Sequence, residues 1–388
     1  MNSTVSAADA FSRDIPRRVE SPTGRLAKIP AGRWQRWGLR LVIAAVYAAL
    51  AVWLNAGYGG DWTGTANADL ATRVDALRFD SGIAVIGDLY PPITSLIALV
   101  IPGGALGLAF AGAFLGGIVV QQVMQAQIRK GFPASVTIIV TLALATTPVY
   151  TYTVTTNFEA TLGLMFFALG MLDLVRFVTR ANTQAGFRAG LLFACSALSD
   201  VYLVFSALVA ALGGALLRQS RTGARLANAI VVAFPTVAVF GSLALLGAAF
   251  GAGPLMMFRG DLSWSTERAT AWVEFLATPS GVLYLAPVAL IALAAIALGS
   301  PWAGLFAVLL NAATAVAFIL GLTPPGTAGT TYIMLVFLAI AIIPSTKSRL
   351  HQGLIGVAAI LLWGIGWATA FTWPVLRTWM ETLGGMAS

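Results

Sequence analysis

Long runs of apolar residues, separated by short polar connections, fill most of the chain from residue 41 onward. A helix that crosses the hydrocarbon core of a bilayer needs roughly 20 predominantly apolar residues. The pattern predicts an all-α, polytopic integral membrane protein with about eleven transmembrane helices. We expect these helices at residues 41–56, 93–121, 134–151, 158–175, 186–198, 201–217, 226–249, 281–299, 302–321, 331–345 and 353–371.

The composition makes lipid the expected solvent of these helices. Of the 388 residues, 58% are hydrophobic and only 10% are charged, and the mean hydropathy is +0.85. A soluble domain of this size could not bury so much apolar side chain, so a lipid bilayer is the expected partner. The single cysteine, Cys195, and the single histidine, His351, exclude an intramolecular disulfide and argue against thiolate or histidine metal sites and Ser-His-Asp catalysis.

Basic residues set the expected orientation. Residues 1–40 form a polar, basic tail with no evident cleavable signal peptide, and we predict that this tail is disordered and cytoplasmic. Most other basic residues fall in alternate connections, such as Arg129-Lys130 and Lys347 to Arg349, as expected for cytoplasmic loops. The net charge of +8 therefore reports topology, and no nucleic-acid partner is expected. The abundance of Ala, Gly and Val with few Lys suggests a GC-rich bacterial genome, so the bacterial plasma membrane is the expected location.

Most acidic residues fall on the opposite, extracytoplasmic side, where two connections are long enough to do more than join helices. The first, residues 55–92, contains an amphipathic segment at 68–79, and the second, residues 251–280, mixes tryptophans with charged residues. Both suit a helix lying at the membrane surface. Acidic residues contribute little to the orientation in which helices insert into the membrane, so their excess on this side indicates a functional outer face. We expect residues 41–388 to form one transmembrane domain.

Several motifs between residues 40 and 217 carry a resemblance to a known family. Asp69 lies in the first outer loop, which closes with Tyr90-Pro91-Pro92 just before the second expected span. Glu159 lies at the outer mouth of the fourth expected span. In these features the chain resembles the GT-C superfamily of membrane glycosyltransferases, particularly the polyprenyl-phosphate-mannose-dependent mannosyltransferases.

The resemblance implies transfer of a sugar, with mannose favoured and a pentose next, from a polyprenyl-phosphate donor to a glycolipid or glycan acceptor of the cell envelope. A carboxylate within hydrogen-bond reach can take the proton of the acceptor hydroxyl, and Asp69 is the candidate base. Glu159 matches the second acidic residue of the family. A single base with no covalent sugar intermediate predicts inversion at the sugar.

The donor phosphate and a metal ion suggest further site residues. A cation near the departing phosphate would stabilise its developing charge, and Arg259 and Arg268 are the first candidates, ahead of Arg73 and Arg78. Asp69 and Glu159 are also the expected ligands if the site uses Mg²⁺ or Mn²⁺, the hard ions that carboxylates prefer. The full set of expected substrate-binding residues is Asp61, Asp88, Tyr90, Arg259 and Arg268.

Two other functions fit the same helix pattern. A transporter or flippase of a lipid or envelope precursor would place ionisable residues near the middle of the bilayer, whereas the acids here concentrate at the outer boundary. A non-catalytic scaffold with the same fold is the third hypothesis. It is kept open by two departures from the family pattern, Asp200 at a position that is often basic and Thr331-Tyr332 where an Arg-Tyr pair is common.

Overall fold

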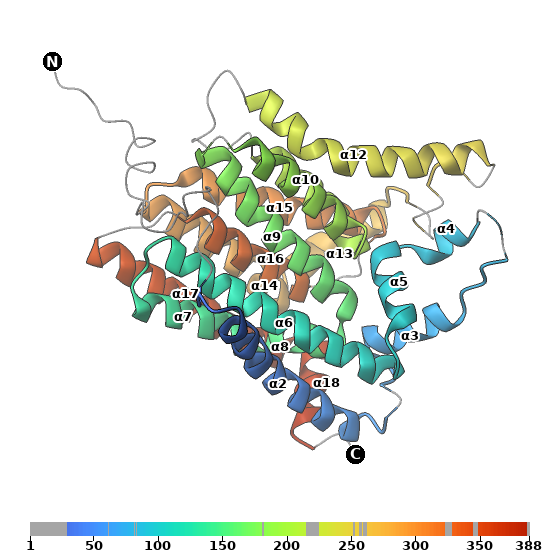
Figure 1. Cartoon of the computed structure of the whole chain (residues 1–388), viewed down its shortest axis with the longest axis horizontal. Coiled ribbons are helices and arrows are strands. Elements are labelled where there is room, and N and C mark those ends of the chain that lie inside the picture. The colour runs from blue at the N-terminus through green and yellow to red at the C-terminus, as the bar shows by residue number, and fades with distance from the viewer. Residues whose placement is uncertain are drawn as a thin grey trace.

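The computed structural model describes an all-helical chain (Figure 1). It covers residues 29–60, 62–80, 82, 84–180, 182–214, 225–250, 253–255, 258, 262–322, 328–343 and 348–385, and no strand occurs among them. The elements are α2 (Arg33–Gly57), α3 (Ala66–Asp75), α4 (Ala84–Leu89), α5 (Pro92–Val100), α6 (Gly104–Arg129), α7 (Ala134–Ala145), α8 (Pro148–Thr156), α9 (Phe158–Arg180), α10 (Thr183–Ala197), η2 (Val201–Leu203), α11 (Val204–Gly213), α12 (Arg225–Ala249), α13 (Thr266–Leu276), α14 (Pro279–Ala297), α15 (Pro301–Ile319), α16 (Ala328–Ile342), α17 (Arg349–Thr372) and α18 (Pro374–Leu383).

The long apolar helices confirm a polytopic membrane protein. Among the described residues, seven helices are long and apolar enough to cross a bilayer, namely α2, α6, α9, α12, α14, α15 and α17. The pair α7 and α8, bent by 54° at its break, supplies an eighth if it forms one span. Helices also occupy the other expected spans, but α10 and α16 have only 15 residues and α11 only 10. The count of eleven crossings therefore stays a prediction.

Three expected boundaries differ from those observed, and one of them is the break between α7 and α8 inside the expected span at 134–151. The expected span at 93–121 is two helices, α5 and α6, because the chain turns at Pro102-Gly103, where Gly103 has a positive φ of 92° that glycine adopts without strain. The first described helix, α2, begins at Arg33, inside the region expected to be a disordered tail. Residues 1–28 of that tail lie outside the described residues. A continuous apolar pattern locates a helix more reliably than its breaks.

The centre of the molecule is built on close contacts between helices. Helix α16 is buried along nearly its whole length and contacts α6, α8, α9, α14 and α15. Small residues permit such approaches: a Cβ added at Gly112 of α6 would lie 2.3 Å from the carbonyl oxygen of Val154 in α8. Small residues at contact points are typical of helix packing in membranes, where interhelical attraction depends on van der Waals contact.

Lys130 joins the ends of α6 and α16 at one end of the bundle. Lys130 follows the last turn of α6, and its ammonium donates to the carbonyl oxygens of Ile340, Ala341 and Ile343 at the end of α16, at 2.5, 2.8 and 2.8 Å. At the start of the chain, Ile29 contacts α6 through the side chain of Gln125. These contacts bring together three segments that the sequence assigned to one side of the membrane.

Candidate functional site

Helix α3, the helix expected in the first outer loop, is fixed to the bundle by Asn67. The Asn67 side chain is fully buried, its Nδ2 donates to the Thr155 carbonyl oxygen at 3.2 Å, and its Oδ1 accepts from the Phe158 amide at 2.7 Å. Thr65 caps the helix by accepting from the Ala68 amide. Helix α3 thus lies against the junction of α8 and α9, which gives it a protein partner in addition to any contact with headgroups.

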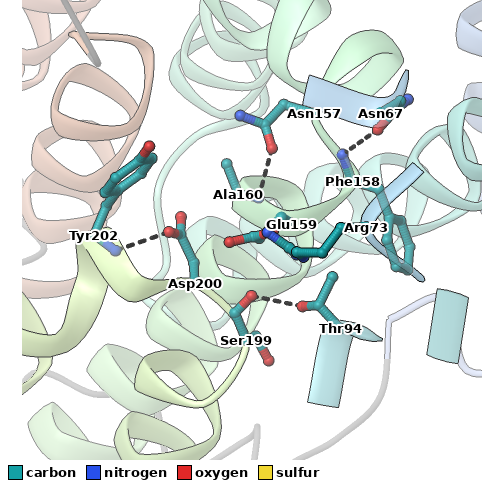
Figure 2. A network of polar contacts seen from close by, with 10 residues as sticks. All are labelled: Asn67, Arg73, Thr94, Asn157, Phe158, Glu159, Ala160, Ser199, Asp200 and Tyr202. Carbon is teal, nitrogen blue, oxygen red and sulfur yellow. Dashed lines mark hydrogen bonds and ion pairs between the residues drawn. The ribbon is translucent and has the colours of Figure 1, made fainter. Parts of the chain in front are cut away.

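Arg73, near the end of α3, forms an ion pair with Glu159 in the first turn of α9 (Figure 2). The Arg73 guanidinium and the Glu159 carboxylate are 2.6 Å apart, and the two side chains are only 24% and 14% exposed. Asn157 caps this end of α9 by accepting from the Ala160 amide at 2.9 Å. The positive end of the helix dipole also favours a carboxylate in the first turn.

Asp200 places a third ionisable group at the same point. It lies in the connection between α10 and η2, is 1% exposed, and accepts from the Tyr202 amide at 2.9 Å through Oδ1. Its Oδ2 is buried and has no hydrogen-bond partner. Figure 2 shows the carboxyl groups of Asp200 and Glu159 facing one another. Burial, together with the negative charge of Glu159, raises the pKa of Asp200 well above its ordinary value.

The connection that carries Asp200 is held by the first turn of α5 and the residues just before it. The Tyr90 hydroxyl donates to the Ala197 carbonyl oxygen at 2.9 Å, and the Ile93 amide donates to that of Leu198 at 3.2 Å. The Thr94 hydroxyl donates to the Ser199 carbonyl oxygen at 2.5 Å. Tyr90 and the first turn of α5 therefore hold the backbone of the loop that carries Asp200. This contact is the structural role of the Tyr-Pro-Pro segment here.

The two predicted catalytic residues lie on neighbouring elements. Asp69 is exposed on α3, four residues before Arg73, so the two side chains share one face of the helix. The Asp69 carboxylate is close enough to the phenol groups of Tyr152 and Tyr202 to interact with them electrostatically. The structure thus brings Asp69 to the edge of a cluster that contains Glu159, and Arg73, one helical turn after Asp69, pairs with Glu159.

The predicted substrate-binding residues are dispersed. Tyr90 is buried, with its hydroxyl engaged as described and its ring against Phe258. Asp88 is exposed on α4. Arg268, on α13, donates from Nε to the Ile319 carbonyl oxygen at 2.8 Å and so caps the end of α15. Asp61 and Arg259 lie outside the described residues.

The expected metal site does not fit the described residues. No group of three or more His, Cys, Asp or Glu side chains gathers to hold an ion in the part of the chain that the structure describes. One oxygen of Glu159, an expected ligand, is bound to the Arg73 guanidinium instead. We therefore derive no step that uses Mg²⁺ or Mn²⁺.

Sequence reasoning missed two features of this site. Asp200 was not among the predicted site residues, although an acid in the short connection of an apolar hairpin is a signal of function because such a residue is costly in the membrane. Arg73 was a secondary candidate, and its pairing with Glu159 joins residues 86 positions apart. Comparison of the chain with family models, curated proteins and solved structures finds no match.

Proposed function

We propose that the protein is a membrane glycosyltransferase that transfers a sugar, with mannose favoured and a pentose next, from a polyprenyl phosphate to a glycolipid or glycan acceptor. The observation that carries the proposal is the partly buried Arg73–Glu159 ion pair, with Asp69 exposed one helical turn away and Asp200 beside it. A base at the edge of a site and a cation within it are the two groups that such a transfer needs.

Each group has a defined part in the proposed reaction. Asp69, accessible on α3, takes the proton of the acceptor hydroxyl as its oxygen attacks the anomeric carbon of the sugar. The bond from that carbon to the phosphate oxygen breaks, and the electron pair leaves with the polyprenyl phosphate. Arg73 stabilises the charge that returns to the phosphate, and it replaces Arg268 in this role because α15 already engages the Arg268 side chain. Attack opposite the leaving group inverts the anomeric centre.

The proposed location follows from the distribution of charge. The basic residues at the ends of α6 and α16 and in the N-terminal tail face the cytoplasm in a bacterial plasma membrane. The opposite end, with α3, the start of α9 and Asp200, then lies on the extracytoplasmic side. Polyprenyl-phosphate donors and envelope acceptors would meet the site at that surface.

Transfer of radiolabelled sugar tests the proposal. Membranes that contain the wild-type chain should transfer mannose, or else a pentose, from its polyprenyl phosphate to lipid or glycan. Asp69→Asn should reduce transfer by at least about 100-fold, as expected for loss of a general base. Asp75→Asn is the matched control, because it also removes an exposed acid from α3, and it should keep wild-type transfer. Equal activity of both variants would reject Asp69 as the base.

One observation favours the transporter or flippase as a second candidate. A buried carboxyl such as Asp200, next to an ion pair, is also typical of proton-coupled transport. Proteoliposomes that contain a fluorescent polyprenyl-phosphate sugar distinguish the two functions. A transporter would move the lipid between leaflets without cleaving it, whereas the enzyme would release polyprenyl phosphate when an acceptor is present. A scaffold would do neither.

A further inference from the structure

Two buried polar atoms without hydrogen-bond partners lie beside the same ion pair. One is Nε of Arg73, and the other is Oδ2 of Asp200. Arg73 comes from α3, Glu159 from α9 and Asp200 from the connection between α10 and η2, so three separate segments converge to place them. Buried polar groups in proteins are nearly always paired, and an exception calls for an explanation such as a ligand.

The charges of the three side chains indicate the kind of ligand. Among the described side chains, an ionised Asp200 would set two carboxylates against one guanidinium, and the site would repel an anion. With a proton on Asp200, Glu159 and Arg73 balance each other and the site is neutral. Burial and the adjacent Glu159 carboxylate raise the pKa of Asp200, so the neutral arrangement persists to a higher pH than an ordinary carboxyl would allow.

We propose that this site binds the phosphodiester of the lipid-linked donor through Arg73. A proton held by Asp200 lets Arg73 exchange Glu159 for the phosphate, because Asp200 can then replace Arg73 as the partner of Glu159. The Arg73 guanidinium leaves Glu159 for the phosphate oxygens, whose planar spacing it matches. Glu159 then accepts a hydrogen bond from the protonated Oδ2 of Asp200. One proton stays between the two carboxyls, so the pair carries a single negative charge before and after, and no covalent bond changes.

The inference rests on the proposed function for the identity of the lipid, but the binding site can be tested without transfer. Among the described residues, the ionisable groups that face Asp200 are Glu159 from α9, Arg73 from α3, Tyr202 from η2 and Tyr90 ahead of α5, with Asp69 farther along α3. The tyrosines stay neutral between pH 6 and 9 because their charged forms are disfavoured by burial. A phosphodiester also keeps one negative charge over this range, so Asp200 dominates the expected pH dependence.

The experiment measures binding to the full chain in detergent micelles at pH 6, 7, 8 and 9, without acceptor. The probes are farnesyl-phosphoryl-mannose, dimethyl phosphate as a small water-soluble diester, and farnesol as an uncharged lipid. Wild-type affinity for farnesyl-phosphoryl-mannose should be constant at low pH and then fall by up to about tenfold per pH unit as Asp200 ionises. Farnesol should bind at least about tenfold more weakly at pH 6, because it offers Arg73 no anion.

Variants separate the roles of the two unpartnered groups. Asp200→Asn keeps a donor toward Glu159 and an acceptor for the Tyr202 amide, so it should bind the probe within about twofold of wild type at pH 6 and lose the pH dependence. Arg73→Gln should weaken binding by at least about tenfold at every pH. Arg73→Lys, which keeps the charge, should bind with intermediate affinity and retain the pH dependence. Asp75→Asn should match wild type throughout.

Several results would overturn the inference. The role of the proton would be rejected if the affinity of the wild type for farnesyl-phosphoryl-mannose did not change with pH. It would also be rejected if the affinity of Asp200→Asn fell with pH as steeply as that of the wild type. Unchanged affinity in both Arg73 variants would reject Arg73 as the group that binds the phosphate. If Arg73→Gln does not fold, the affinity of Arg73→Lys decides this point. Binding of dimethyl phosphate but not of the lipid would reject a lipid ligand. Intact binding without any sugar transfer would reject the proposed enzyme and leave this site standing.

Discussion

The Arg73 guanidinium donates to Oε2 of Glu159 across 2.6 Å and thereby ties the end of α3 to the first turn of α9. The pair links the first extracytoplasmic loop of the proposed topology with the transmembrane core. Both side chains are more buried than exposed, so water screens the interaction only in part. The pair is therefore a feature of the fold as well as of the proposed site.

Breaking this pair from one side should destabilise the protein. Glu159→Ala leaves the Arg73 charge without its carboxylate, and loss of one partner of a buried pair costs about 3 kcal/mol. The apparent midpoint of thermal unfolding in detergent should fall by roughly 5 °C or more. The doubly exchanged variant Arg73→Glu/Glu159→Arg should recover part of the loss. If the single variant unfolds at the wild-type temperature, the pair contributes nothing to stability.

Asn67 should be essential for holding α3 in place. Asn67→Ala leaves the Phe158 amide and the Thr155 carbonyl oxygen without their partner, which costs about 2 kcal/mol or more. Hydrogen exchange of α3 should accelerate, and transfer activity should fall along with it. Thr72→Ala, at an exposed position of the same helix, serves as the control and should leave the exchange unchanged. Slow exchange in Asn67→Ala would contradict the assigned role.

Asp200 should make stability depend on pH. Because its pKa is raised in the folded protein, the folded state binds more protons than the unfolded state above the ordinary value of 3.8. The stabilisation linked to that proton is complete below this value and is lost as pH rises toward the folded pKa, by up to about 1.4 kcal/mol per pH unit. Thermal unfolding of wild type and Asp200→Asn between pH 5 and 9 tests this, and the variant should gain relative stability as pH rises. Parallel curves would contradict it.

Lys130 should stabilise the end of α16. Its ammonium donates to the carbonyl oxygens of Ile340, Ala341 and Ile343 at the C-terminal end of α16, where the last carbonyls of a helix have no partner within the helix. Lys130→Met should lower stability by about 2 kcal/mol or more, because buried carbonyl groups lose a charged donor. Arg349→Gln, which removes an exposed basic residue, should have little effect on the unfolding temperature. Equal stability of Lys130→Met and the wild type would show that water replaces the ammonium.

The sequence predicted where helices occur better than how they run. Hydropathy depends on composition, so it placed short apolar segments at 186–198, 201–217 and 331–345, where α10, α11 and α16 occur, without deciding whether each of them crosses the bilayer. It also ran through the turn at Gly103, because an apolar pattern does not change when the chain bends. Helix α18 was not predicted because its apolar residues form only one face of a 10-residue helix, so the segment as a whole is not apolar.

The candidate site was predictable only in part for a related reason. Asp69 and Glu159 were found from their positions relative to the expected spans, and the structure brings them to adjacent elements. The site also depends on contacts between segments that are distant in the sequence. Arg73 pairs with Glu159, and Asp200 lies beside both. Tyr90 and Arg268 were predicted to bind substrate, yet their polar groups bind backbone carbonyls because the fold uses them to join its segments.

The most direct test of the central claim uses purified protein in liposomes with a polyprenyl-phosphate donor that carries radiolabelled mannose, and with extracted bacterial envelope glycolipids as acceptor. The labelled sugar should pass to the acceptor with release of polyprenyl phosphate in the wild type and in Asp75→Asn, and should stay on the donor in Asp69→Asn. Donor that remains intact with the wild type, whether it carries mannose or a pentose, would contradict the assignment as a glycosyltransferase.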